Sequence, residues 1–93
     1  MSAAAAERLG LVGRVLPDAE LLAETTALAR RIAAGPRIAF GYMKRNLHAA
    51  ETEPLDAVLE MEAMHQIRAS GTEDHKEARQ AFVEKRKPVF RGR

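Results

Sequence analysis

The residues best suited to chemistry lie near the end of the chain, where one aromatic side chain precedes a cluster of cations. Residues 84–93 hold five Lys/Arg against one Glu, although the whole chain of 93 residues has a formal charge of only +2. Phe82 precedes Lys85 by three positions, so on a helix both side chains project from one face. A flat heteroaromatic group could stack on Phe82 while a phosphate meets the Lys85 ammonium. One hypothesis is therefore a small phosphorylated ligand.

Two other interpretations of this cluster stay open. Lys and Arg in the last turn of a helix are favoured by the helix dipole, so the cluster also fits a solvated helix C-terminus. Nucleic-acid binding requires basic residues spread along a face with aromatic side chains between them. The rest of this chain is net acidic, so we expect no nucleic-acid partner.

The three histidines do not have the spacing of a metal site. His48, His65 and His75 lie on different expected helices and lack the i, i+4 spacing with which two histidines grip a metal ion. We therefore expect solvated or capping histidines, with no metal site and no required cofactor.

Two carboxylates near the start of the last expected helix offer one candidate acid–base pair. Glu73 and Glu77 share a helix face, and paired carboxylates can act as acid and base. Acidic residues in a first helical turn are also ordinary complements to the helix dipole, and Lys76 and Arg79 lie close enough to neutralise these two. We predict no catalytic residues in this chain.

Glycine and proline predict where the first helices begin and end. A short helix over 3–9 is stopped by Gly10. Residues 11–16 are apolar and partly β-branched between a glycine and a proline, so we expect an extended segment, with a short edge strand as one form of it. Asp18 is the expected N-cap of the next helix, which Gly35 closes.

Three further helices follow, with their boundaries at Pro36, Pro54 and Gly71. Thr72 or Ser70 caps the last of them, which runs to about Lys87 and carries the cations of 85–87 in its last turn. We therefore predict an all-α chain: a small bundle of four to five helices with one short extended segment at about 11–16. It forms one helical (sub)domain over 1–93.

The apolar faces of the middle helices are less clear. On the helix after Pro36, one side carries Ile38, Ala39, Tyr42, Met43 and Leu47. The next helix has a stripe formed by Leu55, Val58 and Leu59. Glu62 and Gln66 fall in the middle of that stripe and would need partners if buried. Alternatively, the helix is rotated so that Met61 and Met64 are the buried residues.

Composition sets limits on the core and on location. The chain has four aromatic residues, no Trp and no Cys, so the core must come from aliphatic side chains and Met, and partners would help to stabilise it. No apolar run approaches the roughly 20 residues that a membrane span requires. The N-terminus lacks the pattern of a secretory signal. We expect a cytoplasmic protein with no membrane partner.

Several segments together resemble the C-terminal third of the enoyl-CoA hydratase/isomerase (crotonase) family. The most specific is the ending Ala81-Phe82-x-Glu84-Lys85-Arg86-x-Pro88, supported by Gly10-Leu11-Val12. Weaker matches along the rest of the chain are Leu28-Ala29, Ile32-Ala33, Pro36, Ala39, Lys44, Leu59, Glu62, Gln66, Asp74 and Glu77. Ala78 departs from the family, which usually has Gly there.

The resemblance implies a fold, a ligand and a mode of assembly. Family members are much longer lyases and isomerases of fatty acid metabolism. Their N-terminal ββα spiral carries the oxyanion hole and the acidic residues that move protons, and we expect that domain to be absent here. Their C-terminal helices build contacts in trimers and hexamers. By position, Phe82 and Lys85 match residues that contact the adenine and the 3′-phosphate of CoA.

Two functions follow as hypotheses. In the first, the chain is a C-terminal fragment of an enoyl-CoA hydratase/isomerase-like protein. It contributes subunit assembly and part of a CoA- or acyl-CoA-binding surface, and is inactive alone. In the second, it is a stand-alone helical self-association module that does not bind CoA. We expect a homo-oligomer in either case, because helices without their usual neighbours would expose apolar faces.

Overall fold

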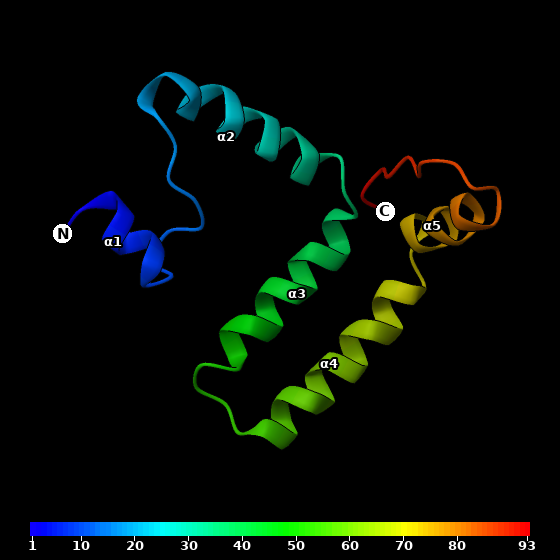
Figure 1. Cartoon of the computed structure of the whole chain (residues 1–93). Helices are drawn as coiled ribbons and strands as arrows, with labels where there is room; N and C mark the ends of the chain where they lie inside the picture. Colours follow the sequence, from blue (N-terminus) through cyan, green and yellow to red (C-terminus); the bar gives the residue numbers. More distant parts are fainter. The chain divides into compact units, whose positions relative to one another are not determined.

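The computed structural model describes all residues 1–93 and contains five α-helices and no β-strand (Figure 1). The helices are α1 Ala3–Arg8, α2 Asp18–Ala33, α3 Arg37–Ala49, α4 Leu55–Ser70 and α5 Glu73–Val83. The predicted all-α class is confirmed. Residues 11–16 lie outside any helix, as expected, but they form no edge strand. The chain divides into two compact units, 1–30 and 31–93, which are described separately below. The (sub)domain over 1–93 stays a prediction.

In the first unit, α1 ends where glycine was expected to stop it. Gly10 has a φ of +72°, a left-handed conformation that glycine adopts without a steric penalty. The Leu11 N–H donates to the Ala6 carbonyl at 2.9 Å, and the Gly10 N–H donates to the Glu7 carbonyl at 3.0 Å. This pair of bonds is the Schellman motif, which satisfies carbonyls that the helix leaves free. A local sequence signal therefore ends this helix.

Polar contacts join α1 to the residues that follow it. The Glu7 carboxylate accepts a hydrogen bond from the Val15 N–H at 2.9 Å. Arg14 forms an ion pair with Glu24 of α2 at 2.5 Å, with both side chains at least half exposed. These contacts hold the 11–16 segment without any ladder of backbone hydrogen bonds.

The predicted N-cap role of Asp18 is wrong, because Asp18 is the first residue of α2 itself. The Pro17 carbonyl accepts the first hydrogen bonds, from Glu20 at 2.9 Å and Leu21 at 3.1 Å. Asp18 then complements the helix dipole from inside the first turn. No residue of α2 is buried.

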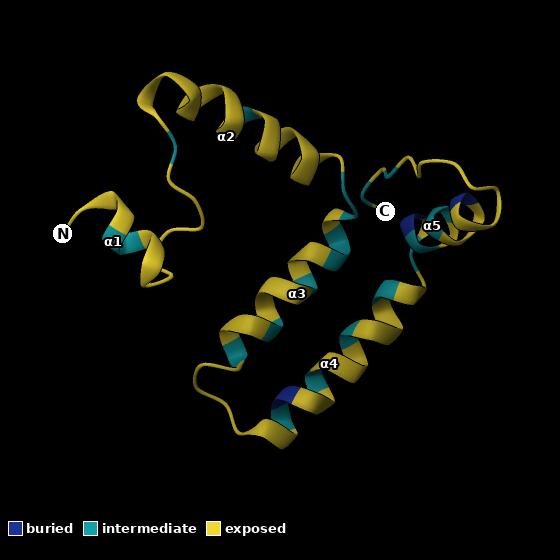
Figure 2. Ribbon diagram, in the orientation of Figure 1, coloured by how far each residue is buried: buried dark blue, intermediate teal, exposed yellow.

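In the second unit, α3 and α4 form an antiparallel hairpin with a thin interface (Figure 2). From α3 the half-buried residues are Ile38, Ala39, Tyr42, Asn46 and Ala49, and from α4 the buried or half-buried residues are Ala57, Val58, Met61, His65 and Ala69. Across the whole chain, only Val58 and Ala81 are buried hydrophobic residues. The aliphatic core expected from composition is therefore very small.

The predicted faces are correct in part: Ile38, Ala39 and Tyr42 of α3 and Val58 of α4 are half-buried or buried, and the other residues of those faces are not. Met43 and Leu47 of α3 are 58% and 72% exposed. On α4, Leu55 and Leu59 are also exposed, and Glu62 and Gln66 lie in solvent and need no buried partner. The rotated alternative is correct for Met61, which is half-buried, but wrong for Met64, which is 49% exposed.

A polar and aromatic cluster lies at the hairpin interface. The His65 ring of α4 stacks on Tyr42 of α3, with centroids 4.5 Å apart and an interplanar angle of 20°. His65 Nδ1 is hydrogen-bonded to Asn46 Oδ1 at 2.5 Å. The Arg45 guanidinium lies 5.9 Å from the Tyr42 ring centroid. The expectation that His65 is a solvated or capping histidine is therefore wrong.

The helix boundaries of the second unit follow the predicted prolines and glycines closely. Pro36 and Pro54 are the N-caps of α3 and α4, and Gly71 is the C-cap of α4. Pro36 thus precedes the first turn that it was expected to occupy. Of the two candidate caps for α5, Thr72 is the one used, because its Oγ1 accepts from the His75 N–H at 3.1 Å. No helix has the length and apolar character needed to cross a membrane.

Candidate functional site

The C-terminal end of α5 differs from its predicted form. The helix ends at Val83, four residues before the predicted end at Lys87, and Lys85 has a φ of +54°. The Arg86 N–H donates to the Ala81 carbonyl at 3.0 Å, and the Lys85 N–H donates to the Phe82 carbonyl at 3.3 Å. This is again a Schellman motif, with lysine at the left-handed position. The predicted placement of the cations of 85–87 in the last helical turn is wrong.

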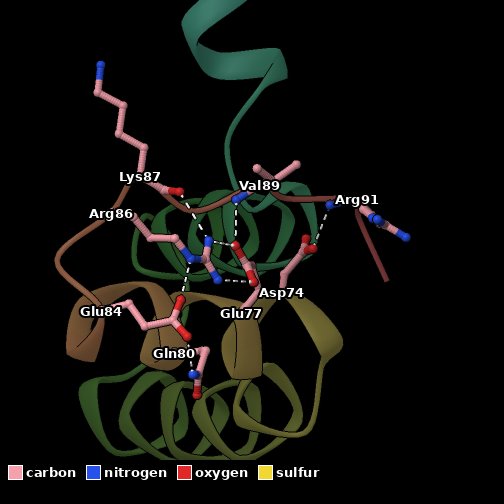
Figure 3. Close-up of polar contacts among 8 residues, drawn as sticks. All are labelled: Asp74, Glu77, Gln80, Glu84, Arg86, Lys87, Val89 and Arg91. Atoms are coloured by element: carbon pink, nitrogen blue, oxygen red, sulfur yellow. Dashed lines mark hydrogen bonds and ion pairs between the residues drawn. The ribbon is translucent and has the colours of Figure 1, made fainter.

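After this turn the chain folds back along α5 as a segment that we call the strap, residues 86–93 (Figure 3). Asp74, only 3% exposed, holds the end of the strap. Its Oδ1 accepts from the Arg91 N–H at 2.7 Å and its Oδ2 accepts from the Gly92 N–H at 2.9 Å. The Asp74 N–H in turn donates to the Arg93 carbonyl at 3.0 Å. The carboxylate and the backbone N–H of one buried residue together fix the path of three residues.

Glu77, one turn further along α5, holds the start of the strap. Its carboxylate receives two bonds from the Arg86 guanidinium, at 2.6 and 3.0 Å, and one from the Val89 N–H at 2.9 Å. Arg86 Nε also contacts Glu84 at 2.5 Å. Figure 3 shows the guanidinium between the two carboxylates. Planar guanidinium groups favour such two-pronged contacts.

The ionisation of these groups reflects the contacts. The Arg86 hydrogen bonds and then the Val89 N–H lower the pKa of Glu77 to about 2. The pKa of Glu84 is lowered first by its hydrogen bond from Gln80 and then by Arg86. The same two carboxylates raise the pKa of Arg86, with Glu77 as the larger cause. All three groups are therefore charged at neutral pH.

The strap also contacts α3. Arg37, in the first turn of α3, donates from Nη2 to the Arg91 carbonyl at 2.9 Å. Gly92 has a φ of +74°, and a Cβ there would lie 2.6 Å from that same Arg37 nitrogen. Phe90 is half-buried and lines a small cavity together with residues from the start of α3 and the first turns of α5. The strap is thus fixed at both ends and in the middle.

Phe82 and Lys85, the two residues that the resemblance assigns to CoA, both lie exposed at the C-terminal end of α5. Phe82 is 86% exposed, although it is a large aromatic residue on the last turn of α5. Lys85 and Lys87 are exposed, and neither forms an ion pair. The argument from a shared helix face does not apply to Lys85, because that residue lies beyond the helix. The assignment of Phe82 and Lys85 to a CoA site stays a prediction.

Glu73 and Glu77 serve as structural ion-pair partners. Glu73 is paired with Lys76 at 2.8 Å, and this contact lowers the pKa of Glu73. The partner of Glu77 is Arg86, not Arg79 as expected. A general acid or base works best with a pKa near the working pH. Neither carboxylate meets that requirement. No group of three metal-binding side chains is found.

The contacts that build this site were mostly missed from the sequence. The sequence marked Asp74 only as a first-turn acid and a weak match to the family, and neither signal indicated its contacts with residues 91–93. Arg37 did give one, because a cation in the first turn of a helix is disfavoured by the dipole and therefore needs another partner. That partner is the Arg91 carbonyl, 54 positions along the chain.

Comparisons with known proteins place the chain in a family. The family model described as enoyl-CoA hydratase/isomerase matches residues 1–93. The chain therefore belongs to the enoyl-CoA hydratase/isomerase family.

Individual relatives agree with this assignment. A Rhodobacter capsulatus protein named "Probable enoyl-CoA hydratase" is 40% identical over 88 residues, which are 95% of this chain and 34% of the relative. The 1,2-epoxyphenylacetyl-CoA isomerase of Escherichia coli is 34% identical over 100% of this chain and 36% of the relative. The solved enoyl-CoA hydratase subunit I of Geobacillus kaustophilus is similar with a TM-score of 0.93 and 40% identity, over 100% of this chain and 36% of that one.

The chain spans about a third of the length of these curated relatives. It matches solved structures of the family along its whole length. The helical arrangement described above is therefore that of a C-terminal helical part of the crotonase fold.

Proposed function

We propose that this chain is the helical C-terminal portion of an enoyl-CoA hydratase/isomerase-like protein and contributes to a CoA-binding surface and to subunit assembly. The ligand is CoA or acyl-CoA, the compound class that the names of its relatives contain. The chain supplies no catalytic residues, and we expect it to be inactive alone toward an enoyl-CoA such as crotonyl-CoA.

The CoA contact is proposed at the end of α5. The observation that carries it is the 86% exposure of Phe82, three positions before an unpaired Lys85. An exposed phenylalanine presents a face on which an adenine ring can stack, and a free ammonium can bind a phosphate. The strap keeps the turn between them in place through Arg86.

Assembly is proposed through the apolar residues of α3 and α4. Leu47, Leu55 and Ile67 are each more than 70% exposed. We expect these side chains to contact other subunits or the rest of a longer protein, because such contacts would remove their apolar surface from water. A homo-oligomer, a trimer or a hexamer as in the family, is the proposed state.

A titration of the chain with CoA, followed by ¹H–¹⁵N NMR, tests the binding. We expect the shift changes to centre on Phe82 and Lys85, and to weaken several-fold in Phe82→Ala. Val83→Ala is the matched control, because Val83 is the next residue and is also exposed, at 76%. Shift changes that are absent, or centred on another helix, would reject the CoA site.

The second candidate function is a stand-alone self-association module without CoA binding. The same exposed leucines favour it, because they require a partner but not a ligand. Sedimentation separates the two functions when combined with the titration. A stable oligomer whose spectrum does not respond to CoA supports the module, and an oligomer that responds at Phe82 supports the CoA site.

A further inference from the structure

The starting observation is the unusual residue at the end of α5. Lys85 is the one residue other than glycine with a positive φ. In this conformation a Cβ crowds the following carbonyl, so glycine is the usual residue at this position of a Schellman motif. The corresponding position after α1 is Gly10. A strained backbone with a long charged side chain persists only where the surroundings hold it.

The residue after Lys85 supplies that support. Arg86 forms two bonds to Glu77 and one to Glu84, and its Nη1 lies 3.3 Å from the Lys87 carbonyl. At the corresponding position after α1, Leu11 is apolar and has no side-chain hydrogen bond. Figure 3 shows these contacts converging on Arg86, while the Lys87 side chain extends away from them.

The neighbouring cations Lys85 and Arg86 differ in whether their charge is paired within the molecule. The charge of Arg86 is used within the molecule, since two carboxylates bind it. Lys85 keeps its charge free and sits on a backbone that its neighbour fixes. A free cation on a fixed backbone loses less freedom on binding an anion than one on a mobile tail, which favours affinity.

We propose that Glu77 and Arg86 are positioning residues: their ion pair holds the left-handed turn so that Lys85 can select ligands with a terminal phosphate. The proposal rests on the CoA site proposed above and deepens it. The selectivity is for the 3′-phosphate, so the site distinguishes CoA from dephospho-CoA. Glu77 and Arg86 themselves do not contact the ligand.

The experiment compares the affinities of CoA and dephospho-CoA by calorimetry in the wild-type chain and in Glu77→Gln. We expect the wild type to prefer CoA by about tenfold, and Glu77→Gln to lose most of that preference. Glu73→Gln is the matched control. It removes the same charge one turn away on the same helix, where the carboxylate binds only Lys76. We expect the preference of this control to equal that of the wild type.

The direction in which Glu77→Gln changes the preference for CoA over dephospho-CoA distinguishes a positioning role of Glu77 from a purely electrostatic one. Loss of a nearby negative charge, or release of the Arg86 guanidinium, would by itself strengthen phosphate binding. A preference that rises or stays unchanged in Glu77→Gln therefore overturns the proposal and leaves the CoA site standing. A wild type that binds both ligands equally rejects phosphate selection by Lys85, and the proposal fails with it.

A second variant covers the case in which Glu77→Gln does not fold, as judged by circular dichroism. Arg86→Lys keeps the charge but cannot form the two-pronged contact with Glu77. We expect the same loss of preference, together with a ¹³Cα shift at Lys85 that moves away from its left-handed value. An unchanged shift and an unchanged preference in this variant contradict the proposal.

Discussion

Two helices of this chain end in the same hydrogen-bonded turn with different residues at its strained position. After α1 the left-handed residue is Gly10, and after α5 it is Lys85. In both turns the next amide bonds back to the carbonyl five residues earlier, at 2.9 Å from Leu11 and at 3.0 Å from Arg86. The backbone geometry is therefore shared, and the side chains are not.

The comparison shows how one turn can act as a simple stop and the other as part of a surface. Gly10 adopts its conformation without strain and needs no support. Lys85 depends on the bonds of Arg86 to Glu77 and Glu84, and on the strap that follows. Glycine would adopt this conformation without strain, so the backbone geometry of the turn does not itself require a lysine. The four predictions below test this contrast.

The largest effect is expected for Asp74→Ala, which removes the support of the strap. It leaves the N–H groups of Arg91 and Gly92 without their acceptor at a part-buried site, beside the space of the removed, buried carboxylate. We expect the free energy of unfolding to fall by about 2–3 kcal/mol in urea denaturation. The control is Asp56→Ala, at the equivalent second position of α4, where the carboxylate is exposed and bonds only to the adjacent Ala57 N–H. A similar loss in both variants would show that the strap adds nothing.

The next effect tests the glycine turn. Gly10→Ala places a Cβ at a φ of +72°, and we expect it to destabilise the end of α1 by about 1 kcal/mol. Faster hydrogen exchange of the Leu11 amide reports the change. Gly13→Ala is the control, because a Cβ there meets no atom within 4 Å and the backbone is not left-handed. Equal exchange rates in the two variants would contradict the role given to Gly10.

Lys85→Gly is expected to act in the opposite direction. Relief of the left-handed strain outweighs the added freedom of the unfolded chain, so the protein gains up to about 1 kcal/mol of stability. Lys87→Gly, two residues later without a positive φ, gives no such gain. If Lys85→Gly destabilises the chain in urea denaturation, the lysine side chain stabilises the fold. The conclusion that Lys85 is strained at a position better suited to glycine would then be wrong.

The smallest expected effect is the loss of the Glu77 contacts with Arg86 and Val89 when acid protonates the Glu77 carboxylate. The folded-state pKa of Glu77 is lowered to about 2 from an ordinary value of 4.5. Its contribution to stability is therefore complete above pH 4.5 and is lost as the pH falls through 2. We expect the Val89 amide, which bonds to Glu77, to lose protection from hydrogen exchange, relative to its intrinsic rate at each pH, as the pH falls from 4.5 to 2. A midpoint near 4.5 would mean that the Arg86 contact is not formed in solution.

The sequence predicts well those features that depend on a few adjacent residues. Gly10 ends α1, Pro54 precedes α4, and Thr72 was one of two proposed caps of α5, because each acts on backbone groups within four positions. The family resemblance was visible for the same reason, as a run of residues around Phe82.

Features set by distant contacts could not be predicted in the same way. In the α3–α4 interface, Tyr42 stacks on His65; apolar periodicity placed Tyr42 on the inner side of α3 but carried no information on its partner His65. The early end of α5 is accompanied by a contact of Arg86 with Glu77, nine positions away, which the residues around Val83 do not predict. From the sequence, the helix was expected to continue to about Lys87, the residue before Pro88.

The polar attachment of the strap determines how it responds to solution conditions. Its contacts with Glu77 and Asp74 are mainly hydrogen bonds and ion pairs, and only Phe90 adds half-buried apolar surface. Detachment therefore exposes little apolar area and has a small heat-capacity change. Ionic strength instead screens the partly exposed pair of Arg86 and Glu77. Added salt should thus loosen this end of the molecule more readily than moderate warming does.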